Sequence, residues 1–350
     1  MKKIILIFVL FSFAGGLKAQ LNLVGEFIRG GVHDGELLAK AYLKPYEISL
    51  GYSAVDSRTI YFNKKNDDAF HFGLGLKVNS IFVPEEDYSF DVSTLGLEHM
   101  EAADPKHTMA QTIFGDTTHI AMRSTDTYQP PFSQELPLTT FNTPDGTGFH
   151  FLPIPDLQLG AYYKNVYAVA SGYVVPYKNV TVFGYNITLG SQVTSFFELT
   201  KDFPVQAEVE AGFGGSSQTV KLEVKPDAKV ELLAKGPYDN QEFTLNLSGY
   251  NIGVGANYRF WKLIFYAKGY YQHFSSRTRL TGNYPVNVKD PTGTLGINVQ
   301  DVTDPIDYTR AYSGMKFTAG LQFDFSFFYL KSDYSFSRYN SFSVSFGVLL

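Results

Sequence analysis

The chain has 350 residues, no cysteine, and a net charge of −5 from 34 acidic and 29 basic residues. An acidic chain lacks the clustered cations that displace counterions from nucleic acid, which excludes nucleic acid as an expected partner. The absence of cysteine excludes disulfides, thiolate chemistry, cysteine-ligated zinc and a lipoprotein anchor.

The first 19 residues have the order of a secretory signal peptide. A basic start, Met1–Lys3, precedes the apolar run Ile4–Phe13 and a small-residue exit that ends at Ala19. The run is too short for a transmembrane helix, which takes about 20 residues. We therefore expect cleavage after Ala19, so that an exported chain begins at Gln20.

Residues 20–45 predict a helical segment. Asp34 is placed as an N-cap, and Lys44-Pro45 is placed as a stop. The apolar residues that share one side of this helix are the candidate plug residues Leu37, Leu38, Ala41 and Tyr42. Ahead of a barrel, such a helix would either plug the interior or form a periplasmic appendage, and the sequence leaves both readings open.

From residue 46 the chain alternates apolar and polar residues, as strands with two different faces do. At the C-terminus, Phe342, Val344 and Phe346 alternate with Ser341, Ser343 and Ser345. The alternation predicts twelve strands, near 46–55, 69–80, 88–96, 157–163, 166–174, 181–191, 204–222, 243–258, 262–274, 314–325, 327–337 and 341–350.

The two faces indicate a membrane barrel. One face is rich in Phe and Leu, the other is rich in Gly and Ser, and aromatic residues stand at several strand ends. We therefore expect an all-β fold, an antiparallel transmembrane β-barrel of about 12 strands (10–14 by this pattern) spanning residues 46–350 in the outer membrane of a Gram-negative bacterium. A soluble β-sandwich or solenoid is the alternative.

Long and short connections between the strands are expected on opposite sides of the membrane, as in bacterial barrels. If both chain ends are periplasmic, the longest connections, near 97–156, 223–242 and 275–313, all fall outside the cell. The turns near 164–165, 259–261 and 326 then fall in the periplasm. A count of ten or fourteen strands would give the same sides.

The strand face opposite the apolar one carries charges of both signs. The lumen-facing candidates are Lys77, Glu208, Glu210, Lys268, Lys316, Asp324, Lys331 and Asp333. Such charges would line a polar path or a binding site, or would pair across a packed lumen, because unpaired buried charges are costly.

The sequence predicts no enzyme, metal site or cofactor. The longest loop holds His99, His107, His119 and His150, but their spacing matches no compact metal-ligand motif. Neither a G-x-S-x-G nucleophile elbow nor a phosphate-binding G-x-x-x-x-G-K-[ST] loop is present.

Three stretches together resemble an uncharacterised family of Bacteroidetes outer-membrane proteins, a domain of unknown function. They are Gly35–Pro45, Phe82–Val92 and Phe196–Pro204. The resemblance implies a barrel similar to the long-chain fatty-acid transporter type, with an N-terminal segment inside and no known substrate. The chain departs from such barrels by ending in Leu350 instead of an aromatic residue, although Phe342 and Phe346 keep the pattern.

The function expected from this pattern is transport: a porin-like passive channel or transporter for a small, hydrophobic or amphiphilic solute. The alternative is a structural or surface-interaction barrel with a closed lumen that acts through its extracellular loops. The expected partners are the lipid bilayer, the outer-membrane assembly machinery and that small ligand.

Overall fold

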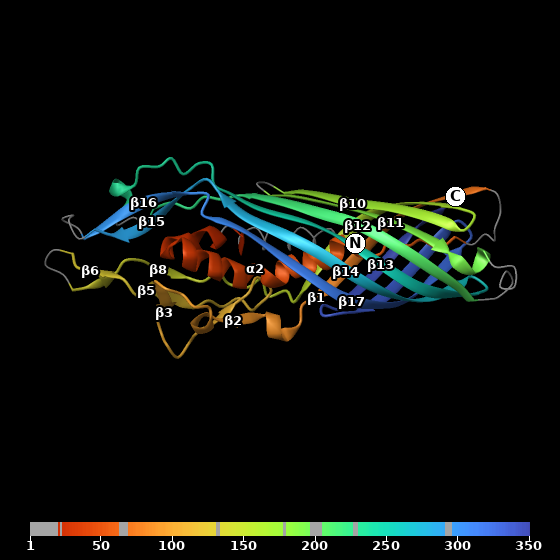
Figure 1. The fold of residues 1–350 in the computed structure, drawn as a ribbon, viewed down its shortest axis with the longest axis horizontal. Helices are drawn as coiled ribbons and strands as arrows, with labels where there is room; N and C mark the ends of the chain where they lie inside the picture. The colour runs from red at the N-terminus through yellow and green to blue at the C-terminus, as the bar shows by residue number, and fades with distance from the viewer. Residues whose placement is uncertain are drawn as a thin grey trace, which may run out of the picture.

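The computed structural model describes residues 20–350, except 22, 63–68, 131–133, 178–179, 197–204, 227–229 and 291–295. Within this part of the chain, ten antiparallel strands close into a barrel in the order β1-β19-β18-β17-β14-β13-β12-β11-β10-β9 (Figure 1). The signal peptide predicted at residues 1–19 lies outside the described residues.

The barrel strands are β1 (Phe70–Phe82), β9 (Phe151–Tyr163), β10 (Val166–Tyr177), β11 (Val180–Gln192), β12 (Val205–Lys221), β13 (Glu242–Phe260), β14 (Leu263–Thr281), β17 (Ile306–Phe325), β18 (Phe328–Phe336) and β19 (Ser341–Leu349). The helical elements are η1 (Gly25–Gly30), α2 (Val32–Ala54), η2 (Glu85–Asp87), η3 (Val92–Thr94), η4 (Val193–Phe196) and η6 (Glu231–Leu233). No helix among the described residues has both the length and the apolar character of a membrane crossing.

The two faces of the wall differ as the alternation predicts. Inward side chains such as Gln158, Asn186 and Thr188 are polar and buried. Outward side chains such as Leu157 and Ile252 are large and apolar, yet 59% and 58% exposed. The wall therefore presents an apolar ring outside and a polar ring inside.

The prediction of twelve strands is wrong, because two of the expected strands are not part of the wall. Of the expected strand 46–55, residues 46–54 form the C-terminal part of α2, inside the barrel, and Val55 is the C-cap of that helix. Every residue from Pro45 to Ala54 is buried, so the alternation there does not correspond to one polar face and one lipid-facing apolar face. A helix satisfies its own backbone hydrogen bonds, which a lone strand in the lumen could not do.

The second missing strand, residues 88–96, belongs to the long connection after β1. Only β2 (Ser89–Asp91) is extended, pairing with β4 (Met109–Gln111). Asp91 then accepts hydrogen bonds from the backbone N and the hydroxyl of Ser93, which turns the chain into η3. A local side-chain bond of this kind competes with strand pairing.

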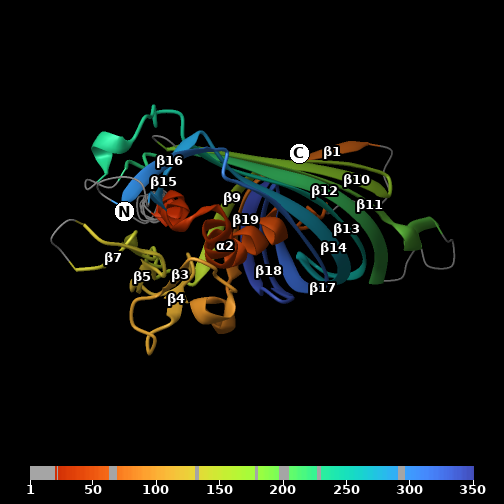
Figure 2. The same ribbon diagram turned by 60° about the vertical axis from the view of Figure 1, so that its left-hand side comes forward.

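The long connections gather at one end of the barrel, here called the loop end; the tight turns define the turn end (Figure 2). The connections run through residues 83–150, 222–241 and 282–305, close to the predicted loops. They hold β3 (Met100–Ala102), β5 (Ala121–Ser124), β6 (Thr127–Tyr128), β7 (Leu136–Pro137), β8 (Thr140–Asn142), and the hairpin β15 (Asn283–Lys289) with β16 (Ile297–Thr303).

The N-terminal segment enters the barrel from the loop end, so the premise that both chain ends lie at the turn end is wrong. Gln20 Nε2 donates to the Gly146 carbonyl in the long connection, 3.3 Å away. At the other end of the segment, Arg259 beside the 261–262 turn donates to the Phe62 carbonyl at 2.5 Å. Residues 20–62 thus run through the lumen before β1 begins.

The boundaries of the helix also differ from the prediction. Gly31, not Asp34, is the N-cap, and α2 passes through Pro45 to end at Ala54. Proline disrupts an exposed helix because it lacks an N–H donor. Here every residue from Pro45 to Ala54 is buried inside the barrel, and this packing maintains the helix beyond the proline. Asp34 serves another purpose, described below.

The wall contains a seam between β9 and β10, where pairing stops at Leu157 and Gly172. Val83 N donates to His150 O, so odd-numbered residues of β9 direct their backbone groups toward β10. Pro153 and Pro155 stand at these positions and have no N–H to donate. By the same parity, the backbone nitrogen of Pro176 in β10 faces β9.

Candidate functional site

Arg58 and two side chains of the barrel wall cap the C-terminal end of α2. Arg58 Nη2 donates to the Ser53 carbonyl at 2.8 Å, and Asn186 Nδ2 of β11 donates to the Ala54 carbonyl at 2.8 Å. The next carbonyl, that of Val55, accepts from Gln272 Nε2 of β14 at 3.2 Å. Helix ends leave such carbonyls unsatisfied, so these side chains fix the point at which the helix ends and the extended segment begins.

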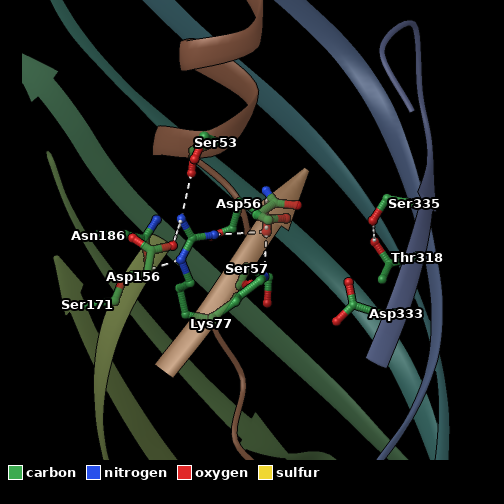
Figure 3. Close-up of polar contacts among 12 residues, drawn as sticks. Ser53, Asp56, Ser57, Lys77, Asp156, Ser171, Asn186, Thr318, Asp333 and Ser335 are labelled. Carbon is green, nitrogen blue, oxygen red and sulfur yellow. Dashed lines mark hydrogen bonds and ion pairs between the residues drawn. The ribbon is translucent and has the colours of Figure 1, made fainter. Parts of the chain in front are cut away.

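Asp56 lies at the centre of a buried ion cluster, here called the Asp56 cluster (Figure 3). Its carboxylate accepts from Lys77 Nζ at 2.7 Å, from Arg58 Nη1 at 2.8 Å, and from Lys316 Nζ. Arg58 Nη2 also lies 2.9 Å from the Asp156 carboxylate. One carboxylate of the N-terminal segment thus binds cations from β1 and β17, on different parts of the wall.

A second cluster, the Glu210 cluster, lies around residues 59–61. Lys268 Nζ is 2.7 Å from the Glu210 carboxylate and 3.1 Å from that of Glu208. Tyr61 OH donates to Glu208 and Tyr167 OH donates to Glu210, both at 2.7 Å. A phenol of the N-terminal segment therefore completes an ion pair between two strands, which holds the segment against β12 and β14.

All eight charged residues predicted to face the lumen are buried inside the barrel. Seven of them are in ion pairs, the longest being Lys331–Asp333 at 4.0 Å. The eighth, Asp324, accepts from Gln322 Nε2 at 2.7 Å. The arrangement corresponds to the packed lumen joined by ion pairs, one of the two readings of the sequence.

The sequence reasoning missed Asp56, Arg58 and Asp156. Asp56 and Arg58 followed a supposed first strand, and Asp156 was assigned to a loop. One signal was available for Asp156, because it has the same parity as Gln158 on β9 and so faces inward. Nothing in the local sequence marks Asp56 or Arg58, since apart from each other their charged partners, Lys77, Asp156 and Lys316, all come from later strands, the nearest 21 residues away.

Little space remains between these clusters in the part of the chain that the structure describes. The cavity that borders Asp56, Thr59, Lys268 and Lys331 has a volume of about 10 Å³. A space of that size holds roughly one water molecule. Buried ion pairs cost several kcal/mol to separate, so residues 55–62 are fixed in place across the lumen.

Two buried carboxylates tie the loops to α2. Asp34 accepts from the backbone N of Glu98 at 2.9 Å and of His99 at 2.8 Å. Asp87 accepts from Lys44 Nζ at 2.7 Å and from Tyr339 OH at 2.7 Å, and lies 3.2 Å from Arg338 Nη2.

The surroundings of Asp87 change its acidity. Burial raises the pKa of Asp87, but the hydrogen bonds from Lys44 and Tyr339 and the nearby cations outweigh burial and hold the pKa below its usual value of 3.8. The ionised form is therefore the one that joins α2, η2 and the β18–β19 turn.

The four plug candidates separate into two pairs. Leu38 and Tyr42 are fully buried against the loops, whereas Leu37 and Ala41 are only partly buried. Leu37 and Ala41 line a cavity of about 330 Å³, here called the side cavity. Its other lining residues include Pro45, Phe90 and Leu95, with Lys40, Lys44 and Arg310 among its charged neighbours.

The four loop histidines each pair with one aspartate. The ring nitrogens lie 2.9 Å from Asp126 for His99, 2.7 Å from Asp104 for His107, 2.9 Å from Asp145 for His119, and 3.7 Å from Asp116 for His150. Across the described ranges, no group of three or more metal-ligating side chains could hold a metal ion.

One further histidine pairs with a serine on the outward face. His273 Nδ1 lies 2.8 Å from Ser313 Oγ across β14 and β17, and both side chains are exposed. The described carboxylates form no hydrogen bond with this ring. A nucleophilic serine needs a histidine held in position by a third group, so this pair does not make a catalytic triad.

A family model described as "Family of unknown function (DUF6588)" matches residues 1–350. The chain belongs to this family. No curated protein matches it.

Solved structures with a similar course of the chain include an attachment protein, an outer membrane protease and a toluene transporter. The attachment invasion locus protein Ail of Yersinia pestis is 7% identical, with a TM-score of 0.28 over 80% of this chain and 98% of Ail. The outer membrane protease OmpT from Escherichia coli is 10% identical, with a TM-score of 0.30 over 83% and 98%. The Pseudomonas putida toluene transporter TodX is 11% identical, with a TM-score of 0.25 over 86% and 96%. At these scores no function passes from those proteins to this one, and the barrel rests on its own strand pairing.

Proposed function

We propose that this DUF6588 protein is a β-barrel of the bacterial outer membrane that its own N-terminal segment closes, and that it acts through its loop end. The ring of exposed apolar residues on the wall supports a place in a membrane, and the leader-like residues 1–19 support export. By the usual orientation of bacterial barrels, the loop end faces outward.

The closed state is the second of the two roles expected from the sequence, and one observation carries it. Asp56 binds three cations of the barrel interior, and the cavity beside it is only about 10 Å³. A passive channel would require residues 55–62 to leave the lumen. That step would separate Asp56 from Lys77 and Lys316, and Arg58 from Asp156, at a cost of several kcal/mol for each buried ion. It would also break the hydrogen bond from Tyr61 to Glu208.

Planar lipid bilayers test this proposal. We expect the purified protein to insert from detergent and to show no steady conductance. A stable open level in the unmodified protein would overturn the closed state and favour the passive channel. A protein that dissolves without detergent and does not partition into lipid would overturn the membrane location itself.

A further inference from the structure

One strand of the barrel has an open edge at the loop end. The β17–β18 ladder stops at Phe317, paired with Phe336, whereas β17 continues to pair with β14 as far as Ile306. Asp324 N donates to Lys262 O, so even-numbered residues of β17 bond to β14. Odd-numbered residues therefore direct their N–H and C=O groups to the other side, where no strand follows.

The open edge comprises Asp307, Thr309, Ala311, Ser313 and Met315. None of the hydrogen bonds between described residues uses the backbone groups of these five. From Asp307 to Ser313 the outward side chains are small or polar and exposed, and large apolar ones begin at Met315. The edge therefore stands in water, above the apolar ring.

An open edge in water recruits other strands unless the sequence blocks it. The seam between β9 and β10 is blocked in this way by Pro153, Pro155 and Pro176, whose nitrogens face the gap. The edge of β17 has no such protection, because residues 306–325 contain no proline. The two interruptions of the wall thus differ in whether a strand can be added.

The side cavity lies beside this edge. Arg310 of β17 lines it together with Leu37 and Ala41 of α2 and with Phe90 and Leu95 of the long connection. A strand added to β17 would point alternate side chains inward, toward α2. An apolar side chain there would fill a cavity whose floor is apolar.

The charges around the cavity balance one another. Lys44 and Arg338 are 39% and 46% exposed and share the buried carboxylate of Asp87, and the exposed acid Glu86 also lines the cavity. Arg310 is paired with Glu47 at 3.2 Å, and Lys40 with Glu36 at 2.5 Å. The apolar floor of the cavity, and not its charged rim, therefore selects the side chain that enters.

We infer that the edge of β17 from Asp307 to Met315 is a docking site for an extended peptide of another protein, which adds as a strand and inserts an apolar side chain into the side cavity. Main-chain bonds would supply affinity, and the cavity would supply specificity. The inference rests on the proposed function, because it names the partner through which a closed barrel acts at its loop end.

The test uses a displayed library of random nine-residue peptides, selected on the full chain in lipid nanodiscs. Three variants accompany it. Ala311→Pro removes one N–H from the centre of the edge without touching the bonds to β14, and Ala311→Val is its matched control because it retains the N–H. Ala41→Trp fills the cavity from the partly buried face of α2 and leaves the edge intact.

We expect enrichment of peptides with alternating β-forming residues and one apolar anchor. An enriched peptide should bind Ala311→Pro and Ala41→Trp at least tenfold more weakly than the unmodified chain, and Ala311→Val about equally. Methylation of its alternate backbone nitrogens should abolish binding.

Other results would overturn the inference. No enrichment, or a peptide that binds both test variants and its N-methylated form unchanged, would mean that the edge is not the site. Edge-dependent dimers that Ala311→Pro dissociates would show that a second copy occupies it. Displacement of a bound peptide by octanoate and by octanol alike, together with tighter binding of these amphiphiles than of any peptide, would assign the cavity to a small amphiphile. Bilayer conductance is read independently, so failure of this inference and failure of the closed state are distinguishable.

Discussion

Replacing Asp56 by asparagine should loosen the N-terminal segment. The carboxylate is buried and accepts from Lys77 at 2.7 Å, from Arg58 at 2.8 Å and from Lys316. The substituted amide would have no charge to offer these cations. Arg58 would retain the Asp156 carboxylate at 2.9 Å, whereas Lys77 and Lys316 would lose the carboxylate with which each forms its ion pair among the described residues. Breaking a buried ion pair from one side costs about 3–5 kcal/mol. At about 1.4 kcal/mol per factor of ten, the released segment should become roughly 100- to 4,000-fold more populated.

A cysteine reporter can measure this release, because the chain contains no other thiol. Ser49 is fully buried in α2, and its hydroxyl has no hydrogen-bond partner, so Ser49→Cys changes little in the closed state. A water-soluble thiol reagent should modify this cysteine slowly in the parent and much faster beside Asp56→Asn. Asp307→Asn is the matched control, since it and its partner Arg277 lie at the surface, where solvent screens an ion pair and little stability is lost with it.

The reasoning would be refuted by equal labelling rates in Asp56→Asn and in Asp307→Asn, with both barrels intact by circular dichroism. In that case the Asp56 cluster would be a feature of the wall and not the anchor of the segment.

Two further predictions concern the loop end and the seam. The ion pairs of Asp87 stabilise the fold when its carboxylate is ionised; because its pKa is lowered, this contribution is complete above pH 3.8 and is lost as the pH falls through the folded value. Asp87→Asn should therefore lower the melting temperature at pH 7 and make little difference near pH 2, and an equal difference at both pH values would contradict the assignment. Replacing Pro153 and Pro155 with valine restores two N–H groups that face β10, each new hydrogen bond being worth about 0.5–1.5 kcal/mol. The Val174 amide should then exchange more slowly with deuterium, whereas an unchanged rate would show that something other than the missing donors keeps the seam open.

The wall of the barrel was largely predictable from the sequence. A strand between lipid and a polar lumen has two different faces. Apolar and polar residues therefore alternate in its sequence, as they do from Phe342 to Phe346. The same parity placed Lys77, Lys268 and Lys316 inside, where the structure has them.

The contents of the lumen were less predictable. A segment surrounded by the wall on all sides buries polar and apolar residues alike, so Tyr46, Glu47 and Ile48 are all buried and their alternation gives no guide to conformation. The partners of Asp56 and Arg58 come from strands that only the closed barrel brings together. The short strands of the long connection, such as β6 and β7, have two residues each and carry no period to detect.

Hydrogen–deuterium exchange of the backbone tests most directly the central claim that the chain's own residues fill its lumen. In the intact protein in lipid, peptides covering residues 53–62 should exchange as slowly as those from β12 and β14, because Tyr61 N donates to Gln322 and Arg58 N to Thr188 inside the wall. Exchange of residues 53–62 within seconds, while the strands remain protected, would contradict a filled lumen and would favour a passive open channel over the closed barrel.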